Sequence, residues 1–202
     1  MKKLELLAPA GDFSKLKTAL YFGADAVYVG GKAFSLRALA GNFDNDELKQ
    51  ATEYTHKLGK KIYVTANILA RNYDFEALKG YFEFLNDIKV DGIIISDVGV
   101  LNYAKKYAPD VPLHVSTQMN VLNAETVRFW RDFGVKRVIL ARELSLEEVS
   151  YIHTSVPDVE LETFVHGAMC ISYSGRCLLS NYFTGRDSNR GACVQACRWE
   201  YE

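Results

Sequence analysis

Short apolar runs alternate with amphipathic stretches along the first 165 residues of the chain. The apolar runs are rich in Val, Ile and Leu and lack strict polar alternation, which is typical of parallel strands covered on both faces. Seven such strands are expected at residues 4–8, 26–29, 61–66, 92–96, 113–116, 136–141 and 161–165. The stretches between them have helical periodicity. They predict six helices at residues 12–22, 44–58, 74–88, 99–107, 123–133 and 145–153.

Residues at the helix ends support these boundaries. Four predicted helices begin at a residue whose side chain can accept a hydrogen bond from the first turn, namely Asp12, Asp44, Asn123 and Ser145. Ser145 and Glu148 also have the spacing of a capping box. Gly23, Gly92 and Gly134 stand in similar local sequences. Each is predicted to sit in a turn that ends one helix and leads into the next strand.

Seven strands alternating with six helices indicate either a doubly wound sheet or a (β/α)8 barrel. No strand is followed by a G-x-G-x-x-G turn, which disfavours a dinucleotide-binding fold. A complete barrel usually needs about 250 residues, and the 202 residues show no clear eighth strand. We therefore expect a TIM-barrel-like α/β fold that is incomplete in this chain. Residues 1–165 would form the barrel repeat, and residues 166–202 a segment packed at its mouth.

In both architectures ligands bind at the carboxyl ends of the strands. The polar residues expected there are Asn67, Asp97, Ser116, Gln118, Asn120, Arg142, Glu143 and His166. If the fifth strand continues through residue 120, Ser116, Gln118 and Asn120 share one face. The simpler alternative is that such residues only cap helices or pair locally, as Arg142 would with Glu143.

Composition excludes several classes of protein. Hydrophobic residues make up 49% and charged residues 24% of the chain, as in ordinary folded domains. The net charge is −1, from 24 Lys and Arg against 25 Asp and Glu, so no chain-wide basic field indicates nucleic acid. No apolar run reaches the roughly 18 residues of a membrane span, and the first residues do not resemble a signal peptide. We expect a cytoplasmic protein that does not enter a membrane.

All four cysteines lie in the last 33 residues, at Cys170, Cys177, Cys193 and Cys197. In a reducing compartment such clustering suggests metal ligation or redox chemistry before disulfides. Six, fifteen and three residues separate them, so paired C-x-x-C knuckles of a zinc ribbon are missing. An iron–sulfur cluster is compatible with this spacing. Two alternatives remain open: reduced thiols that act as small hydrophobes, and a catalytic Cys170 with His166 as its base.

The same segment is basic. Residues 171–199 hold four arginines and one aspartate, a net charge of +3. The arginines are suited to bidentate binding of carboxylates or phosphates, and they are Arg176, Arg186, Arg190 and Arg198. Aromatic residues that could stack on a base lie between them, at Tyr173, Tyr182, Phe183 and Trp199. Two alternatives remain open: the arginines only form a solvated loop, or they bind an anionic substrate beside the cysteines.

Several motifs together resemble the U32 peptidase (collagenase-like) family. They lie at residues 5–12, 23–31, 34–38, 116–118, 141–145 and 164–199. The likeness covers essentially the whole chain, is most specific in the cysteine segment, and matches the amino-terminal half of bacterial members. It therefore implies a chain that stops before the last barrel strand.

The resemblance implies an activity as well as a fold. Better-understood members are tRNA and ribosomal RNA hydroxylation proteins, which depend on prephenate and add a hydroxyl to a pyrimidine such as the tRNA wobble uridine. Others support oxygen-independent ubiquinone hydroxylation. These relatives carry an iron–sulfur cluster, of the 4Fe-4S type, on cysteines matching Cys170, Cys177 and Cys193, with a fourth ligand usually further downstream. Cys197 is the fourth candidate in this chain.

The first hypothesis is an RNA-hydroxylating enzyme. Arg142, Arg176, Arg186 and Arg190 would hold carboxylates or phosphates. Ser116, Gln118 and His166 would orient the reacting group. Beside them we expect further catalytic and substrate-binding residues, namely Glu143, Asn67 and Asn120.

The second hypothesis is a protease, as the family name implies, although neither H-E-x-x-H nor G-x-S-x-G is present. Its only plausible nucleophile and base are Cys170 and His166, and its partner would be a peptide. The third is a binding scaffold whose chemistry needs the rest of a longer protein. RNA, a quinone precursor and a small anionic metabolite also remain as partners.

Overall fold

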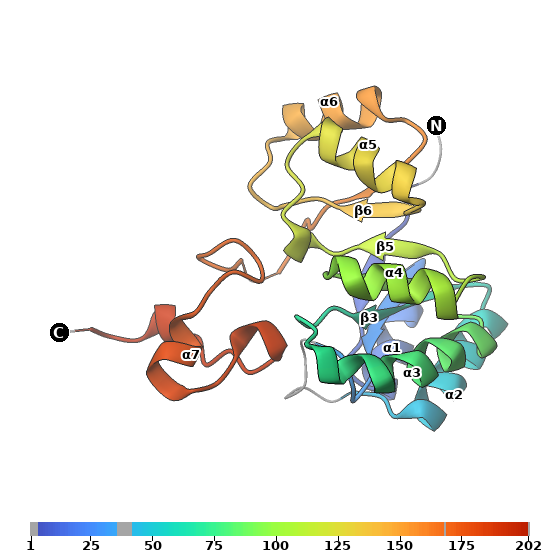
Figure 1. The fold of residues 1–202 in the computed structure, drawn as a ribbon. Helices are drawn as coiled ribbons and strands as arrows, with labels where there is room; N and C mark the ends of the chain where they lie inside the picture. Colours follow the sequence, from blue (N-terminus) through green and yellow to red (C-terminus); the bar gives the residue numbers. More distant parts are fainter. Residues whose placement is uncertain (1–3, 36–41, 168, 202) are drawn as a thin grey trace.

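Seven parallel strands form one curved sheet in a computed structural model, which describes residues 4–35, 42–167 and 169–201 (Figure 1). The strands follow each other in chain order. They are β1 (Leu7–Pro9), β2 (Ala26–Gly30), β3 (Lys61–Ala66), β4 (Gly92–Ile95), β5 (Leu113–Val115), β6 (Arg137–Ile139) and β7 (Glu160–Glu162). All seven predicted strands are confirmed, although β1 and β7 are displaced by a few residues. Part of the family-like motif 34–38 lies outside the described residues.

Six helices connect the strands, close to their predicted positions. They are α1 (Phe13–Tyr21), α2 (Asn45–Lys57), α3 (Phe75–Asp87), α4 (Val98–Tyr107), α5 (Ala124–Phe133) and α6 (Leu146–Ser155). A short helix, α7 (Leu179–Thr184), follows in the cysteine segment, where the sequence showed no helical period. The alternation of strand and helix, with β1 and β7 at the two edges of the sheet, confirms the incomplete TIM-barrel-like fold. No helix in the described ranges is long and apolar enough to span a bilayer.

The predicted helix caps are confirmed. The side chains of Asp12, Asp44, Asn123 and Ser145 each accept a hydrogen bond from a backbone N–H in the first turn. Ser145 and Glu148 form the expected capping box, and Asp44 forms a second one with Glu47. Asp97 also caps a helix, because it accepts from Val100 N at 2.9 Å.

Two of the three predicted glycine turns are confirmed and one is wrong. Gly23 and Gly134 have φ of 101° and 99°, a conformation that favours glycine. In the third turn Lys89 adopts the positive φ, 58°, and Gly92 begins β4 instead. Gly92 is needed there for space, since a Cβ would lie 2.7 Å from the His114 ring.

The core lies mainly between the sheet and its helices. Strand residues that face the helices form one large cluster with the buried helix positions, including Leu16, Phe82 and Leu101. The opposite, inner face of the sheet holds a smaller apolar cluster. Its buried members are Ala26, Tyr63, Ile94 and Ile139. The rest of the inner face carries polar side chains, among them Arg137.

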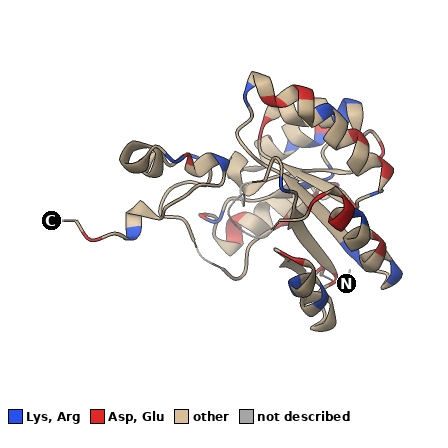
Figure 2. Cartoon of the chain, turned by 90° about the horizontal axis from the view of Figure 1, so that it is seen from below, with Lys and Arg blue, Asp and Glu red and all other residues tan. Residues whose placement is uncertain are grey.

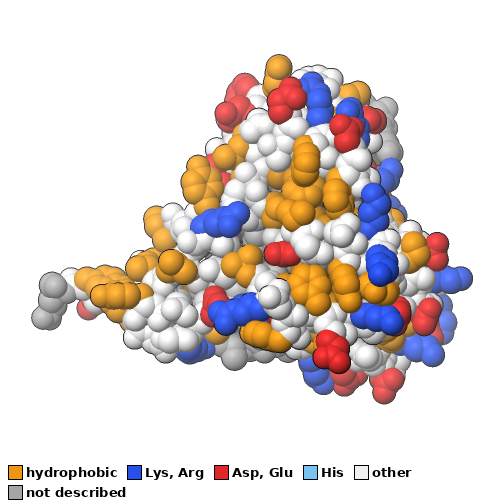
Figure 3. Space-filling model, in the orientation of Figure 1, with side chains coloured by type: hydrophobic (Ala, Val, Ile, Leu, Met, Phe, Trp, Pro, Cys, Tyr) orange, Lys and Arg blue, Asp and Glu red, His pale blue; other side chains and the backbone are white. Residues whose placement is uncertain are grey.

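The chain after β7 is built differently. Residues 163–201, here called the C-terminal segment, leave the sheet and carry α7 and three-residue 3-10 turns such as Ser188–Arg190 (Figure 1). Its described part buries only Ser180, Asn189 and Ala196. Its aromatic residues are exposed, and apolar side chains gather on the projecting part of the segment in Figure 3. The division into two domains stays a prediction.

Candidate functional site

A turn after β5 brings predicted site residues together. The strand ends at Val115, close to its predicted end, and Thr117–Met119 form a 3-10 turn. The strand therefore does not continue through residue 120, which was the condition for Ser116, Gln118 and Asn120 to share one strand face. Asn120 ends the turn with φ of 53°, a left-handed conformation that asparagine tolerates better than most residues. The turn folds Gln118 inward, where it is 6% exposed, instead of aligning it along a strand face.

Hydrogen bonds join this turn to the neighbouring strand ends. Gln118 Oε1 accepts from Asn67 Nδ2 at 2.9 Å and from Ser116 Oγ at 3.2 Å. Ser96, which follows β4, donates to the Asn67 carbonyl at 2.8 Å. Asn120 Nδ2 donates to the Gln118 carbonyl at 2.8 Å. We call Asn67, Ser116, Gln118 and Asn120 the amide cluster, and it unites four predicted site residues.

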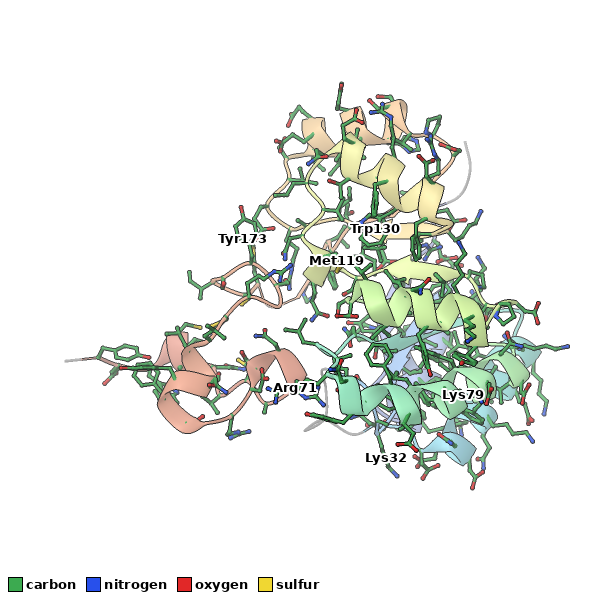
Figure 4. All side chains as sticks on the ribbon, in the orientation of Figure 1. Lys32, Arg71, Lys79, Met119, Trp130 and Tyr173 are labelled. Carbon is green, nitrogen blue, oxygen red and sulfur yellow. The ribbon has the colours of Figure 1, made fainter. Side chains whose placement is uncertain are left out.

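The C-terminal segment touches the amide cluster. Asn120 Nδ2 also donates to the Ser174 carbonyl, at 3.1 Å. A Cβ on Gly175 would lie 3.3–3.5 Å from three side-chain atoms of Gln118, so this glycine packs directly on that side chain. Figure 4 shows Tyr173 on the loop beside the turn that carries Met119. Two parts of the chain that are 54 residues apart therefore meet at the strand ends.

Three other predicted residues, Arg142, Glu143 and His166, are not members of the amide cluster. The Arg142 guanidinium lies 4.9 Å from the ring centre of Phe164, near the start of the C-terminal segment. Glu143 and His166 are exposed. No hydrogen bond links His166 to Cys170 among the residues that the structure describes.

The arginines of the C-terminal segment have different surroundings. Arg190 binds Asp74 through both guanidinium NH2 groups, at 2.9 and 3.0 Å, and donates to the Leu69 carbonyl at 2.7 Å. The hydrogen bonds that Asp74 accepts, from the Arg190 guanidinium first and from Arg71 N, lower its pKa although burial raises it. Within the described ranges no ion pair is formed by the other three, Arg176, Arg186 and Arg198. Figure 2 shows such positive positions along the segment. Arg190 is thus a tether to η1 (Asn72–Asp74), whereas the others face solvent.

The cysteines are free thiols in a loose arrangement. Cys170, Cys193 and Cys197 are exposed and Cys177 is half-buried. Cys193 Sγ is a hydrogen-bond acceptor for Gln195 N at 3.4 Å and Ser180 Oγ at 3.8 Å. Cysteine thiolates are the usual ligands of an iron–sulfur cluster, and hydrogen bonds to their sulfur atoms tune its potential, so these residue types suit such a cluster. However, no three His, Cys, Asp or Glu side chains of the described residues are placed to hold a metal ion, so the geometry does not form a closed cluster site.

A charged network that the sequence pattern did not predict lies on the inner face of the sheet. Arg137 on β6 donates to Glu5 Oε1 at 2.8 Å, to Glu160 Oε2 at 2.7 Å and to Glu162 Oε2 at 3.3 Å. Its guanidinium also lies 4.9 Å from the ring centre of Tyr63. Polar residues at alternate strand positions, such as Glu160 and Glu162, were the available signal, because successive strand side chains face opposite ways.

Burial and hydrogen bonding shift the pKa values in this network. Burial raises the pKa of Glu5, but hydrogen bonds from Lys61, Tyr63 and Arg137 outweigh it and hold the pKa at about 2. Burial lowers the pKa of His114, which packs 4.8 Å from the Tyr63 ring, to about 3. His114 is therefore neutral at physiological pH. The network stabilises ionised Glu5 and Arg137 and stands apart from the amide cluster.

Known proteins resemble this chain over its whole length. The model of peptidase family U32 matches residues 11–202. The tRNA hydroxylation protein P1 of Bacillus subtilis (strain 168) is 49% identical over 201 residues, which cover 100% of this chain and 47% of that protein. The tRNA hydroxylation protein P of Haemophilus influenzae is 46% identical, covering 99% and 44%. The chain spans about half the length of these curated relatives.

A solved structure supports the fold independently. The U32 peptidase Mk0906 superposes with a TM-score of 0.73 over 99% of this chain and 80% of that one, at 18% identity. At that identity the likeness shows the fold alone. The family match, by contrast, spans almost every residue described above, including the amide cluster and all four cysteines. The chain belongs to peptidase family U32.

Proposed function

We propose that this chain carries the substrate site of an RNA-modifying enzyme that hydroxylates a pyrimidine, the wobble uridine of tRNA or a related base, with prephenate as co-substrate. The observation that carries the proposal is the 49% identity to a tRNA hydroxylation protein across the whole chain. The amide cluster supports it, because neutral amide and hydroxyl groups match the hydrogen-bonding edge of a pyrimidine.

In this proposal the uncharged residues bind the base, and the arginines bind anionic groups. Ser116, Gln118 and His166 orient the reacting ring, while Asn67 and Asn120 hold Gln118 in place. Arg176 and Arg186 bind RNA phosphates, since neither has an ion-pair partner among the described residues and an arginine fork matches a phosphate. Arg142 is the cation that binds the carboxylates of prephenate, and Glu143, next to it in the chain, is a catalytic group. Arg190 acts by tethering the segment to Asp74.

The cysteines supply the proposed cofactor site. Cys170, Cys177 and Cys193 are the proposed ligands of a 4Fe-4S cluster, with Cys197 as the candidate for a fourth. A bound cluster would supply electron transfer. We expect iron and acid-labile sulfide in anaerobically purified protein, and their loss in Cys170→Ser. Iron-free protein with full activity would contradict the cluster.

The hydroxylation itself is tested in cells that lack their own tRNA hydroxylation protein. The gene that encodes this chain is expressed there, and the tRNA nucleosides are measured by mass spectrometry. Hydroxylated uridine should return with the wild-type gene and stay absent with Gln118→Ala. If folded wild-type protein restores no hydroxylated pyrimidine, the proposal fails. If Cys170→Ser instead abolishes cleavage of a peptide by the purified protein, the peptidase hypothesis replaces it.

A further inference from the structure

The Gln118 side chain has one end saturated and the other unused. Its Oε1 accepts two hydrogen bonds, from Asn67 Nδ2 and Ser116 Oγ. These two donors fix the orientation of the amide. Gln118 Nε2 is buried and has no hydrogen-bond partner among the described residues. A buried amide donor without a partner is costly, and such groups in native proteins call for an explanation.

The unused donor is covered by a weakly held piece of chain. Residues 173–176 form a turn in which Arg176 N donates to the Tyr173 carbonyl at 3.2 Å. Gly175, with φ of 73°, lies at the crest of this turn and packs on Gln118. One hydrogen bond, from Asn120 Nδ2 to the Ser174 carbonyl, fastens the turn to the amide cluster in the described residues.

The turn has little else to hold it. In the described part of residues 163–179 no side chain is buried. A segment with few buried contacts opens locally at low cost in free energy. By contrast, Gln118 itself is positioned from three strand ends, those of β3, β5 and, through Ser96, β4. Several hydrogen bonds therefore hold the donor in place, whereas few contacts hold the turn that covers it.

We propose that Gln118 Nε2 is the recognition donor for a ring carbonyl oxygen of the pyrimidine base, and that the turn 173–176 lifts from Gln118 to admit that base. The proposal rests on the proposed function, because it takes the RNA base as the ligand. When the base replaces Gly175 beside Gln118, its carbonyl oxygen accepts the hydrogen bond that Nε2 lacks. This hydrogen bond forms only when the ligand is bound.

The chemistry around Nε2 favours a neutral acceptor. The amide cluster consists of uncharged amides and hydroxyls, so it offers no charge to balance a buried phosphate or carboxylate. An amide N–H and the carbonyl oxygen of a uracil ring form a hydrogen bond without charge. Arg176, at the edge of the same turn, is exposed and would remain available for a backbone phosphate.

The test compares two RNA probes and two glutamine variants. The probes are a tRNA anticodon stem-loop with uridine at the wobble position and the same RNA with an abasic residue there. Gln118→Glu keeps an acceptor for Asn67 and Ser116 but replaces the donor by an oxygen. We expect the wild type to prefer the intact RNA, and Gln118→Glu to lose about tenfold in affinity for it, the equivalent of one hydrogen bond. Affinity for the abasic RNA should fall much less, because it loses no contact with the base.

The matched control is Gln50→Glu, which adds the same charge on the exposed surface of α2. Thermal unfolding of each variant shows whether it is folded. A third variant, Gly175→Ala, puts a methyl group against Gln118 in a conformation that suits glycine. It should loosen the turn and speed association with the intact RNA.

The outcomes separate the two proposals. If the wild type binds neither RNA, the proposed function is wrong, and so is the assignment of an RNA base as the ligand of Gln118. If it binds both RNAs equally, or if Gln118→Glu weakens both alike, the role of Gln118 is wrong while RNA binding stands. An unchanged association rate in Gly175→Ala would contradict the covering role of the turn.

Discussion

The β/α body, residues 4–162, and the C-terminal segment, residues 163–201, belong to one chain but are stabilised in different ways. The body buries an apolar face on almost every strand and helix. The segment buries three side chains in its described part and contacts the body through polar ties, from Arg190 to Asp74 and from Asn120 to Ser174. The body's shape is therefore set by packing, whereas the segment's position is set mainly by a few hydrogen bonds and ion pairs.

The largest expected difference is between two aromatic positions. Phe82 in α3 is 0% exposed and Tyr182 in α7 is 82% exposed. Phe82→Ala should lower the free energy of unfolding by about 3–5 kcal/mol, because it removes packing and leaves a cavity. Tyr182→Ala should change it by less than about 0.5 kcal/mol. Urea unfolding of both variants measures this, and similar losses would contradict the comparison.

Acid should destabilise the body through its inner-face network. His114 has a folded pKa of about 3 against an ordinary 6.5, so the unfolded chain takes up the proton first. The stability present above pH 6.5 is therefore lost as pH falls toward 3. Glu5, with its pKa held at about 2 against 4.5, adds a further loss below pH 4.5. The raised pKa of the buried Glu162 acts in the opposite direction.

Urea unfolding at a series of pH values checks this expectation. His114→Leu should remove the decline between pH 6.5 and about 4.5 and leave the decline below it. If the wild type shows a flat free energy of unfolding down to pH 4.5, His114 is not held neutral as the structure indicates.

Removing one tether should loosen the segment and leave the body nearly intact. Arg190→Ala deletes the hydrogen bonds to Asp74 and Leu69, which together are worth about 1–3 kcal/mol of local stability. Asp74 keeps its hydrogen bond from Arg71 N, at 2.7 Å, so the body should lose less. Amide hydrogen exchange should rise in residues 163–201, and Arg198→Ala, at an exposed arginine, serves as the control. Equal exchange in both variants would show that the tether is not needed.

Helix caps give the smallest expected effects. Ser145→Ala should cost about 1 kcal/mol, since the serine caps α6. Leu178 at the start of α7 offers no side-chain cap. Leu178→Asp should therefore slow amide exchange in α7 while changing global stability by less than about 0.5 kcal/mol. A large global gain would mean that α7 is coupled to the body more tightly than the hydrogen bonds indicate.

Local rules in the sequence predicted the body well. Caps such as Asp12 and Ser145 act on their own helix, so the sequence contains all the information they need. The sequence does not predict the positive φ of Lys89, because the nearby Gly92 is the residue expected to take that conformation. Gly92 is required instead by the distant His114 ring. Arg137 and Glu5 are 132 residues apart, and only the curvature of the sheet brings them together.

The candidate site was predicted in composition but not in geometry. Asn67 and Gln118 both follow the carboxyl ends of parallel strands, so a β/α repeat predicts that they lie on the same side of the sheet. The inward fold of Gln118 depends on a 3-10 turn that strand periodicity hides. The positions of the cysteines could not be predicted, because a segment with so little apolar burial has no periodic signal to read.

Arg137 also bears on the shape of the whole sheet. From β6 it reaches Glu160 and Glu162 on the edge strand β7, and Glu5, just before the opposite edge strand β1. Among the described residues no further strand pairs with β1 or β7, and the Arg137 guanidinium binds residues at both of these edges. These side-chain hydrogen bonds link the two edges across the inner face and favour the bend of the sheet, and charges that point inward at a sheet edge discourage pairing with another molecule.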